Sequence, residues 1–486
     1  MKRWIPLLIA LAGCGPAIAP PSLPAPPKPL AVVVDSVVSS APLDRTHWGV
    51  LVVDAASGRE LYRHDAARHY IPASNTKLVV TAVALGLLGP DYRYTTTVRA
   101  GALRADTAAV VVVRGSGDPT LSARFFGARH AALDSLAHAI RRQGVHAIDT
   151  LIVDAGRFVD EHIHGAWEVG DLPWSYAPPT AAFAVEEGTF PLVVAPGSYV
   201  GAPASAHVPG TAAQPVVARV TTDTTGARTR LRIDYLERID TVYVTGTIGL
   251  GAPPDTSSLA VTRPAHFAAT AFGEALGRAG VTVGAVVVAI DSAESRMLEA
   301  RTTPVVEHAS PPMSEIVAAI LRPSQNWIAE QVLKTLGAEH GEGGGWAEGL
   351  AVERRYLVEE AGVDSMSFSL SDASGLSAQN LLAPEAIVRL LAHARARPWA
   401  DAYRSGMAQP GLEGSTLARR FPALQGRLFA KTGTIANVNS LSGYVVADDG
   451  RELLFSILTN GSGRPSANVR AGIDRIVQAI AAGGES

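Results

Sequence analysis

The sequence is poor in lysine and in cysteine. Of its 42 basic residues only five are lysines, so arginine carries almost all of the positive charge. Arginine stays protonated in proteins, whereas lysine can lose its proton near neutral pH when its pKa is depressed. Each lysine that the chain retains is therefore a candidate for chemistry. The lysines are Lys2, Lys28, Lys77, Lys334 and Lys431.

Two further absences narrow the function. Cys14 is the only cysteine, so the fold cannot rely on an internal disulfide. The chain has no basic run and no interleaving of aromatic and basic residues, and its net charge is −3. The chain therefore lacks the usual signature of a nucleic-acid-binding protein, and we expect no nucleic-acid partner.

The N-terminus has the pattern of an export signal. Met1-Lys2-Arg3 is a positive start, and the apolar run Trp4–Ala12 is too short to span a bilayer. The sequence Leu11-Ala12-Gly13-Cys14 follows and resembles the bacterial lipobox, whose cysteine is lipidated. An ordinary signal peptide cut after Ala19 is the alternative, but Pro20 disfavours cleavage there.

We therefore predict a signal peptide over residues 1–13 and a lipidated Cys14. Residues 14–30 form a Pro-rich tether, expected to be extended and semi-rigid. The expected location is extracytoplasmic, on the periplasmic face of a bacterial membrane, with the lipid as anchor. The sequence leaves open whether this is the inner or the outer membrane.

One stretch has the chemistry of a nucleophile. Ser74 precedes Lys77 by three residues at the start of an apolar helix predicted to run to Leu88. At this spacing both side chains lie on one helix face, about one turn apart. The helix start also offers unpaired N–H groups to a developing oxyanion. A serine at this place is also a common helix N-cap, which is the structural alternative.

The length of 486 residues predicts two to four domains, and the composition, 47% hydrophobic and 18% charged, is that of a globular protein. The segments 48–54 and 59–64 read as a β-hairpin, and residues 187–262 are almost entirely β-like. We expect one domain split by a large insertion. Its parts are a first piece (31–95), an inserted α/β domain in two parts (96–165 and 263–300), a small β domain between them (166–262) and a second piece (301–486).

Two more short motifs follow in the second piece. Ser324-Gln325-Asn326 precedes a predicted helix, and Lys431-Thr432-Gly433-Thr434 starts the final strand region. Each alone is weak, because Ser466-Ala467-Asn468 has the first pattern at an ordinary helix start and the second also suits a turn. The three motifs occur in order, however, and they contain two of the four lysines that remain after residue 13.

The trio is typical of class A β-lactamases and penicillin-binding proteins. The 250 residues from Ser74 to Ser324 are too many for a class A β-lactamase. Such an insertion resembles the class C low-molecular-mass penicillin-binding proteins, the D-alanyl-D-alanine carboxypeptidase/endopeptidase family. Further stretches resemble that family, and they are Leu88–Tyr94, Gly115–Leu121, Asp372–Ser377 and Ser440–Tyr444.

The resemblance implies an α+β multidomain fold, with a split penicillin-binding transpeptidase-like (serine β-lactamase-like) domain and a mostly β inserted region. It implies that Ser74 attacks the bond between the terminal D-alanines of a peptidoglycan stem peptide and that Lys77 accepts its proton. Ser324 then relays the proton to the leaving amine. Substrate contacts are implied for Asn326, Lys431, Thr432, Gly433 and Thr434, with the N–H groups of Ser74 and Thr434 as the oxyanion hole.

Asp171 and Tyr176 match the family stretch that approaches the stem-peptide side chain, although aromatic packing between domains explains them equally well. We expect no cofactor and no metal. His162 and His164 form a His-x-His pair without a third ligand at metal spacing.

The sequence thus predicts a serine D-Ala-D-Ala carboxypeptidase, with endopeptidase action on cross-links as a second activity and β-lactams as acylating inhibitors. Two rivals remain open. One is a β-lactamase or esterase on the same scaffold. The other is a catalytically silent cell-wall-binding lipoprotein, which has no need of the two motif lysines.

Overall fold

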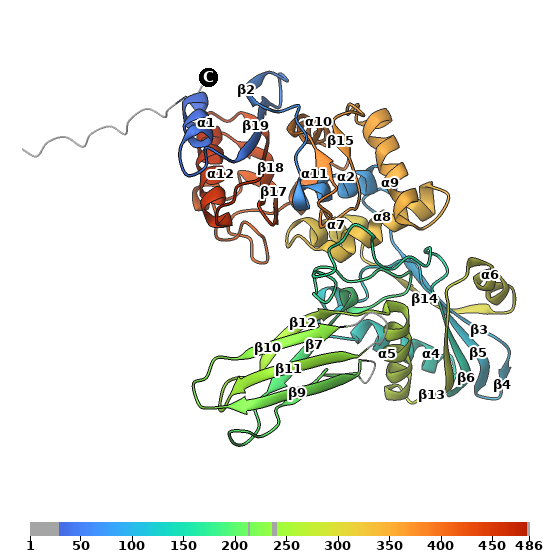
Figure 1. The fold of residues 1–486 in the computed structure, drawn as a ribbon. Coiled ribbons are helices and arrows are strands. Elements are labelled where there is room, and N and C mark those ends of the chain that lie inside the picture. Colours follow the sequence, from blue (N-terminus) through green and yellow to red (C-terminus); the bar gives the residue numbers. More distant parts are fainter. Residues whose placement is uncertain (1–28, 212–213, 236–240, 484–486) are drawn as a thin grey trace, which may run out of the picture.

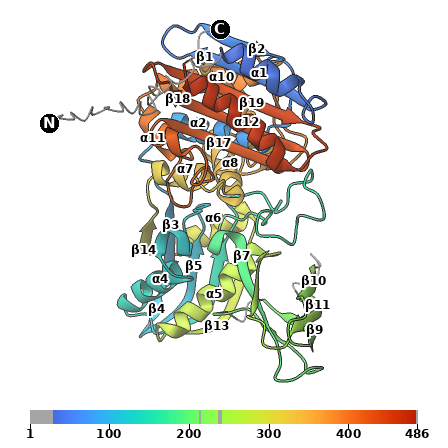
Figure 2. The same cartoon turned by 90° about the vertical axis from the view of Figure 1, so that its left-hand side faces the viewer.

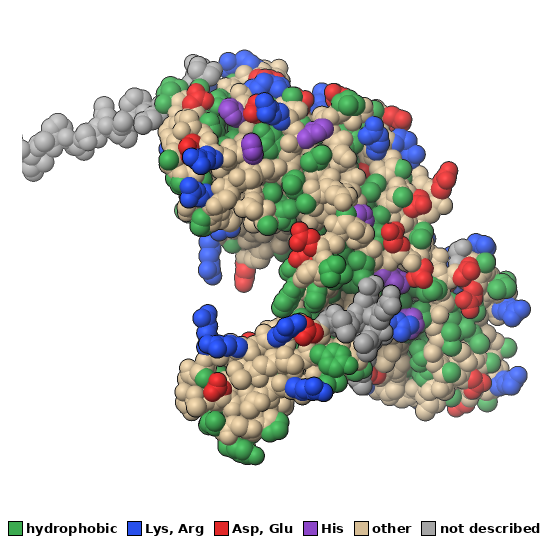
Figure 3. All heavy atoms as spheres, in the orientation of Figure 1, with side chains coloured by type: hydrophobic (Ala, Val, Ile, Leu, Met, Phe, Trp, Pro, Cys, Tyr) green, Lys and Arg blue, Asp and Glu red, His purple; other side chains and the backbone are tan. Residues whose placement is uncertain are grey.

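A computed structural model describes residues 29–211, 214–235 and 241–483. The chain forms two stacked parts, visible in Figures 1 and 2. We call residues 30–94 together with 310–483 the split body, and residues 95–309 the insert. Figure 3 shows the surface hollowed between the split body and the lobe that carries β9–β11. The predicted lipidation site Cys14 and most of the predicted tether lie outside the described residues.

The split body contains an antiparallel sheet in the order β17-β18-β19-β1-β2. The first and last pieces of the chain meet in this sheet, because β1 pairs along its length with β19. Two helices from opposite ends of the chain cover one face and share an apolar cluster with it (Figure 2). The elements are α1 (Leu30–Ser39), β1 (His47–Asp54), β2 (Glu60–His64), β17 (Leu428–Ile435), β18 (Val438–Val446), β19 (Glu452–Asn460) and α12 (Ser466–Ala481).

A helical cluster covers the other face of the sheet. Its centre is α2, whose residues are buried from Lys77 to Leu85, as expected for a helix that is apolar on all sides. A 3₁₀ turn, η1, immediately precedes α2. The elements are η1 (Ala73–Thr76), α2 (Lys77–Leu87), α7 (Met313–Leu321), α8 (Asn326–His340), α9 (Trp346–Arg355), a π turn (Tyr356–Glu360), β15 (Phe368–Ser369), β16 (Leu381–Leu382), α10 (Pro384–Arg395), α11 (Ala400–Gly406) and a 3₁₀ turn (Pro422–Leu424).

The insert is built on a mixed sheet in the order β13-β6-β5-β3-β14, with β4 beside β5. Three neighbouring strands, β5, β6 and the edge strand β13, are parallel, and α4 and α5 pack together against the sheet. The elements are β3 (Thr95–Ala100), β4 (Leu103–Arg104), β5 (Thr107–Arg114), α3 (Ala123–Phe126), α4 (Ala131–Arg142), β6 (Ala147–Asp154), α5 (Pro264–Arg278), β13 (Thr282–Ala289), α6 (Ser292–Ala300) and β14 (Thr303–Ala309).

Two small three-stranded sheets make up the rest of the insert, in the orders β12-β7-β8 and β10-β11-β9. Figure 1 shows β9, β10 and β11 as an arm that reaches away from the larger sheet. The elements are a 3₁₀ turn η2 (Glu186–Gly188), β7 (Thr189–Ala195), β8 (Ser205–His207), β9 (Val216–Asp223), β10 (Arg230–Tyr235), β11 (Val242–Gly249) and β12 (Asp255–Ala260).

Several sequence predictions can be compared with this fold. The hairpin is confirmed as β1 and β2, and the β-like character of residues 187–262 is confirmed in their described part. The helix α1 was not anticipated. One boundary also differs, because β14 pairs with β3 and extends the sheet of the insert past residue 300 to Ala309. Among the described residues, no helix has the length and apolar character needed to cross a bilayer.

Candidate active site

The serine and lysine of the first motif meet at the junction of η1 and α2. Lys77 is fully buried, and its Nζ donates to Ser74 Oγ at 2.9 Å. The turn before them is held tightly, because Gly375 packs on the carbonyl of Ala73. A Cβ at Gly375 would lie 1.9 Å from that oxygen, and its φ of +77° also favours glycine. The predicted proximity of the two side chains is therefore present.

Lys77 has two further hydrogen-bond partners from distant parts of the chain. Its Nζ donates to Asn326 Oδ1 at 2.6 Å and to the carbonyl oxygen of Ser374 at 2.5 Å. The amide of Asn326 also donates through Nδ2 to the carbonyl of Tyr176 at 2.7 Å. Asn326 thus links the lysine to a loop of the insert, and its amide orientation follows from its two partners.

The second motif lysine forms a matching pair on β17. Lys431 is fully buried, and its Nζ donates to Ser324 Oγ at 2.8 Å and to the carbonyl of Thr432 at 2.7 Å. Ser324 lies between α7 and α8 with a φ of +67°, a conformation that non-glycine residues seldom adopt. The loop therefore accepts backbone strain at the residue that faces Lys431, which is common at functional sites.

Burial sets the protonation of both lysines. It lowers the pKa of Lys77 to about 7, against the opposing attraction of the charges on Asp372 and Glu330. Burial, and then the charge of Lys77, also hold the pKa of Lys431 well below its usual range. A neutral amine at Lys77 is thus accessible near neutral pH, as a proton acceptor requires.

Glu330, a buried carboxylate on α8, binds the backbone of the segment that contacts Lys77. Its Oε1 accepts from the N–H of Ser374 at 2.8 Å, and its Oε2 accepts from Ala373 N at 3.2 Å and Trp346 Nε1 at 2.8 Å. Burial and the charge of Asp372 raise the pKa of Glu330 to about 7. Glu330 therefore fixes the segment whose carbonyl, that of Ser374, touches Lys77.

Asp372 anchors the same segment from its other end. Its carboxylate accepts from Gly375 N and Ser377 N, both at 2.7 Å, and from Trp167 Nε1 of the insert at 3.0 Å. Sequence reasoning gave neither acid a role. The stretch Asp372–Ser377 was recognised only as a resemblance, and Glu330 had no sequence signal, because a glutamate within a helix is unremarkable in sequence.

The third motif, which begins at Lys431 on β17, packs closely against the turn that carries Ser74. A Cβ at Gly433 would lie 2.7 Å from the carbonyl oxygen of Pro72 and 3.0 Å from Ser74 N, so only glycine lets β17 approach the turn this closely. Asn75 fastens the two together, since its Nδ2 donates to the carbonyl of Lys431 at 3.1 Å and to Ser440 Oγ at 2.7 Å. The backbone N–H groups of η1 and β17 are thereby held close to each other.

A cavity of about 480 Å³ opens in front of Ser74 and is lined also by Asn326 and Thr434. Asp171 and Tyr176 line it from the insert, where Tyr176 OH donates to Asp171 Oδ1 at 2.9 Å. Burial, followed by the Asp171 hydrogen bond, raises the pKa of Tyr176 to about 12. Tyr176 is 44% exposed and forms part of the cavity wall.

The other candidate residues, His162, His164 and Lys334, do not line the cavity in front of Ser74. His162 contacts Asp160 at 2.7 Å, and His164 packs edge-on against Trp346. No group of three or more metal-ligating side chains occurs in the part of the chain that the structure describes. Lys334 sits over the Trp346 ring at 3.9 Å and donates to the carbonyl of Glu161, in a packing role.

Comparison with known proteins gives consistent relatives. The model of the D-Ala-D-Ala carboxypeptidase 3 (S13) family matches residues 30–480. A D-alanyl-D-alanine carboxypeptidase of Actinomadura sp. (strain R39) is 34% identical over 488 residues, covering 95% of this chain and 86% of the relative. A penicillin-sensitive carboxypeptidase A of Dictyostelium discoideum is 25% identical, covering 89% of this chain and 86% of its own length.

Solved structures share the fold. Penicillin binding protein 4 (dacB) of Haemophilus influenzae superposes with a TM-score of 0.79 at 19% identity, covering 92% of this chain and 98% of that chain. The predatory peptidoglycan endopeptidase Bd3459 of Bdellovibrio bacteriovorus gives 0.53 at 16% identity, covering 90% and 94%. With the family model matched over nearly the whole body and a relative at 34% identity, the chain belongs to the D-Ala-D-Ala carboxypeptidase 3 (S13) family.

Proposed function

We propose that the protein is a serine D-Ala-D-Ala carboxypeptidase that hydrolyses peptidoglycan stem peptides through an acyl-enzyme on Ser74. The single observation that carries the proposal is the contact of Ser74 Oγ with the Nζ of Lys77 at 2.9 Å, in a site where burial lowers the pKa of Lys77 to about 7. A serine becomes a nucleophile at neutral pH when an adjacent base takes its proton.

In the acylation step, the neutral amine of Lys77 takes the proton of Ser74, and Oγ attacks the carbonyl of the penultimate D-alanine. The N–H groups of Ser74 and Thr434 stabilise the oxyanion. Removal of one such donor typically costs about 3 kcal/mol of transition-state stabilisation. As the C–N bond breaks, Ser324 passes its proton to the departing amine and takes up the proton that Lys77 accepted from Ser74, which leaves Lys77 neutral again. The contact of Ser324 with Lys431 at 2.8 Å supports this relay.

The deacylation step restores the enzyme. Water attacks the ester carbonyl, Ser74 leaves as an alkoxide and recovers its proton, and the shortened peptide departs as a carboxylate. Lys77 is placed to accept the water proton and return it to Ser74 Oγ, since it touches that oxygen directly.

Recognition of the substrate terminus falls to β17. Lys431 and Thr432 bind the terminal carboxylate, and the carboxylate in turn favours the charged form of Lys431. β-Lactams present the same carboxylate beside a reactive amide, so they acylate Ser74. Cleavage of D-Ala cross-links forms the same acyl-enzyme, and the departing amine then belongs to a second stem peptide.

The proposed location is extracytoplasmic, with a lipid anchor on Cys14. The lipobox-like sequence Leu11–Cys14 supports it. Metabolic labelling with radioactive palmitate in a bacterial host tests the anchor. We expect label in the wild type and none in Cys14→Ala, and a labelled Cys14→Ala protein contradicts the assignment.

The activity itself is tested by D-alanine release from an acylated peptide that ends in D-Ala-D-Ala. Residues 29–486 should release one D-alanine per peptide. Ser74→Ala should release none, whereas Ser466→Ala, in the unrelated Ser-x-Asn pattern at the start of α12, should match the wild type. A folded Ser74→Ala enzyme that still releases D-alanine contradicts the proposal.

A further inference from the structure

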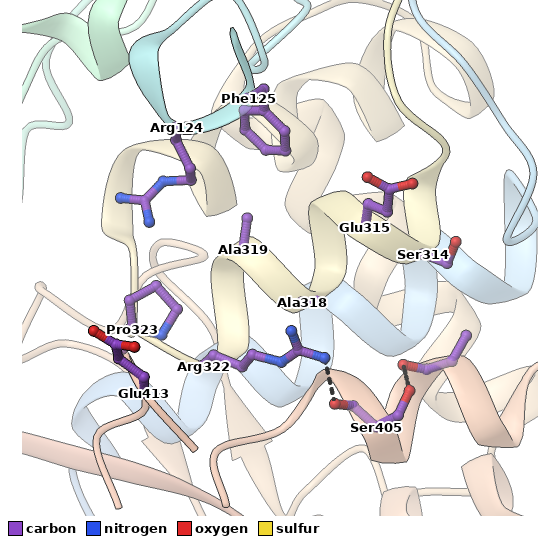
Figure 4. A pocket seen from close by; sticks show the side chains of 12 residues that line it. Arg124, Phe125, Ser314, Glu315, Ala318, Ala319, Arg322, Pro323, Ser405 and Glu413 are labelled. Atoms are coloured by element: carbon purple, nitrogen blue, oxygen red, sulfur yellow. Dashed lines mark hydrogen bonds between the residues drawn. The ribbon is translucent and has the colours of Figure 1, made fainter. Parts of the chain in front are cut away.

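We propose that a second pocket beside the catalytic cavity binds the second stem peptide of a cross-linked substrate, the part that leaves. The inference rests on the proposed function and adds a binding site to it. The pocket, here called the leaving-side pocket, has a volume of about 530 Å³, which is within the usual range for ligand sites. Figure 4 shows it between α7 and the α3 segment of the insert.

The pocket adjoins the catalytic residues through a five-residue segment. Arg322 and Pro323 line the leaving-side pocket, Ser324 contacts Lys431, and Asn326 lines the cavity in front of Ser74. Three residues of extended chain span at most about 11 Å. A peptide bound at Ser74 can therefore reach the leaving-side pocket within a few residues.

A second loop makes the same connection. Glu413 and Gly414 line the pocket, while Thr416 accepts a hydrogen bond from Thr432 Oγ1 at 2.9 Å. The N–H of Thr416 donates to the carbonyl of Arg322 at 3.0 Å, which joins the two loops. The leaving-side pocket thus begins next to Thr432, a residue assigned to the terminal carboxylate.

The order of residues along β17 indicates on which side of Ser74 the leaving part of the substrate lies. Thr434 and Ile435 line the cavity that Asp171 and Tyr176 also line, which places the retained acyl part there. Thr432 lies toward the other end of the strand, where the leaving part must be. At Ala430 the strand edge is bridged by Ala408, so a bound chain has to turn away from the edge.

The lining suits a charged peptide. Phe125, Pro323 and Ala319 supply apolar surface, and Arg322 and Glu413 supply groups of opposite charge. The second stem peptide carries both carboxylates and backbone amides, which pair with such groups. A lone D-alanine leaving group is too small to need them, so the pocket serves the cross-linked substrate specifically.

Cleavage of a cross-link makes and breaks the same kinds of bond as the carboxypeptidase reaction. Ser74 Oγ forms an ester with the D-alanine carbonyl, the cross-linking C–N bond breaks, and Ser324 delivers the proton to the amine of the second stem. Water then hydrolyses the ester. The pocket holds the amine-bearing product and changes no bond.

Filling the pocket tests the proposal. Ala319→Phe occupies it from α7, and Ser405→Trp does so from an exposed position of α11; circular dichroism checks the fold of both variants. Ala392→Phe is the matched control, because Ala392 is also a partly buried helical alanine that lines a different pocket. Each protein is assayed on a cross-linked stem-peptide dimer and on a pentapeptide that ends in D-Ala-D-Ala.

We expect the ratio of dimer cleavage to pentapeptide cleavage, each as kcat/KM, to fall about tenfold in both filled variants and to stay constant in the control. An unchanged ratio in both overturns the subsite. So does a wild type that trims the pentapeptide and leaves the dimer intact, a result under which the proposed carboxypeptidase function stands. A wild type inactive on both substrates overturns the proposed function and the subsite with it.

Discussion

The catalytic centre and the rim around it are built in opposite ways. At the centre, Lys77, Lys431 and Glu330 are fully buried, and each makes two or more hydrogen bonds. At the rim, the insert supplies side chains that water reaches, such as Tyr176 at 44% exposure. Burial fixes polar groups in place and shifts their pKa values, and acid–base catalysis depends on both effects. An exposed side chain can be replaced without disturbing its neighbours, so it can vary with the substrate. Substitutions at the centre should therefore affect every substrate, and those at the rim only some.

The largest effect is expected at the base. Lys77→Met keeps the volume of the side chain and removes the amine, and general acid–base groups typically contribute about 10²–10⁴-fold in rate. Acylation by benzylpenicillin and D-alanine release should both fall by that factor. Stopped-flow or quench measurements give the rates, and circular dichroism checks the fold. Retention of near wild-type acylation would show that another group takes the proton.

The same residue sets a pH dependence. Because the pKa of Lys77 is lowered to about 7 and the neutral amine is the base, the acylation rate should rise as the pH increases through about 7 and level off above it. A pre-steady-state pH profile with benzylpenicillin measures the midpoint. A profile that is flat from pH 5 to pH 9 contradicts this role.

The next effect is expected at the relay serine. Ser324→Ala removes the hydroxyl that touches Lys431 and should slow D-alanine release about 10²-fold. Ser466→Ala is the matched control, since that serine begins α12 and donates to Asn439 of β18. If both variants lose activity equally, the loss comes from folding and not from proton transfer.

A smaller effect is expected at Glu330, which holds the segment that contacts the base Lys77. Glu330→Gln replaces a carboxylate that accepts three N–H groups with an amide, and loss of charge-assisted bonds should lower acylation about 10–100-fold. The charge of Glu330 raises the pKa of Lys77, so its loss should also move the pH midpoint to lower values. Glu339→Gln, at the exposed end of the same helix, is the control. A slower enzyme with an unmoved midpoint indicates a purely structural role.

The smallest effect is expected at the rim. Asp171→Asn leaves the hydrogen bond from Tyr176 in place and removes one charge from the cavity wall. The KM for a stem peptide with an ionised third side chain should change about 3–10-fold, with kcat and the penicillin rate almost constant. Equal losses with peptide and penicillin would place Asp171 in the chemistry and break the distinction between centre and rim.

The sequence carried much of the centre because its motifs are short and their geometry is local. Ser74 and Lys77 are three residues apart on one helical turn, so their contact follows from helix geometry alone. That Ser324 and Lys431 belong to one site with Ser74 was predicted only through the family resemblance, and their contact with each other was not predicted. Their contact depends on tertiary structure that no spacing along the chain encodes.

The features that sequence reasoning missed are long-range and individually ordinary. Glu330 gains its role only because the segment at Ser374 folds against it, 44 residues away. The strand β14 pairs with β3 across 200 residues of insert, so the boundary at 300 could not be read from composition. The leaving-side pocket requires α3 and α7 to face each other, which again only tertiary packing determines.

The central claim is that Ser74 forms an acyl-enzyme, and intact-protein and peptide mass spectrometry after incubation with benzylpenicillin tests it most directly. Wild type and Ser74→Ala are compared on residues 29–486. The account predicts one covalent adduct on the Ser74 peptide of the wild type, long-lived enough to isolate, and none in the variant. A folded, unmodified wild type, or an adduct that persists in Ser74→Ala, contradicts it.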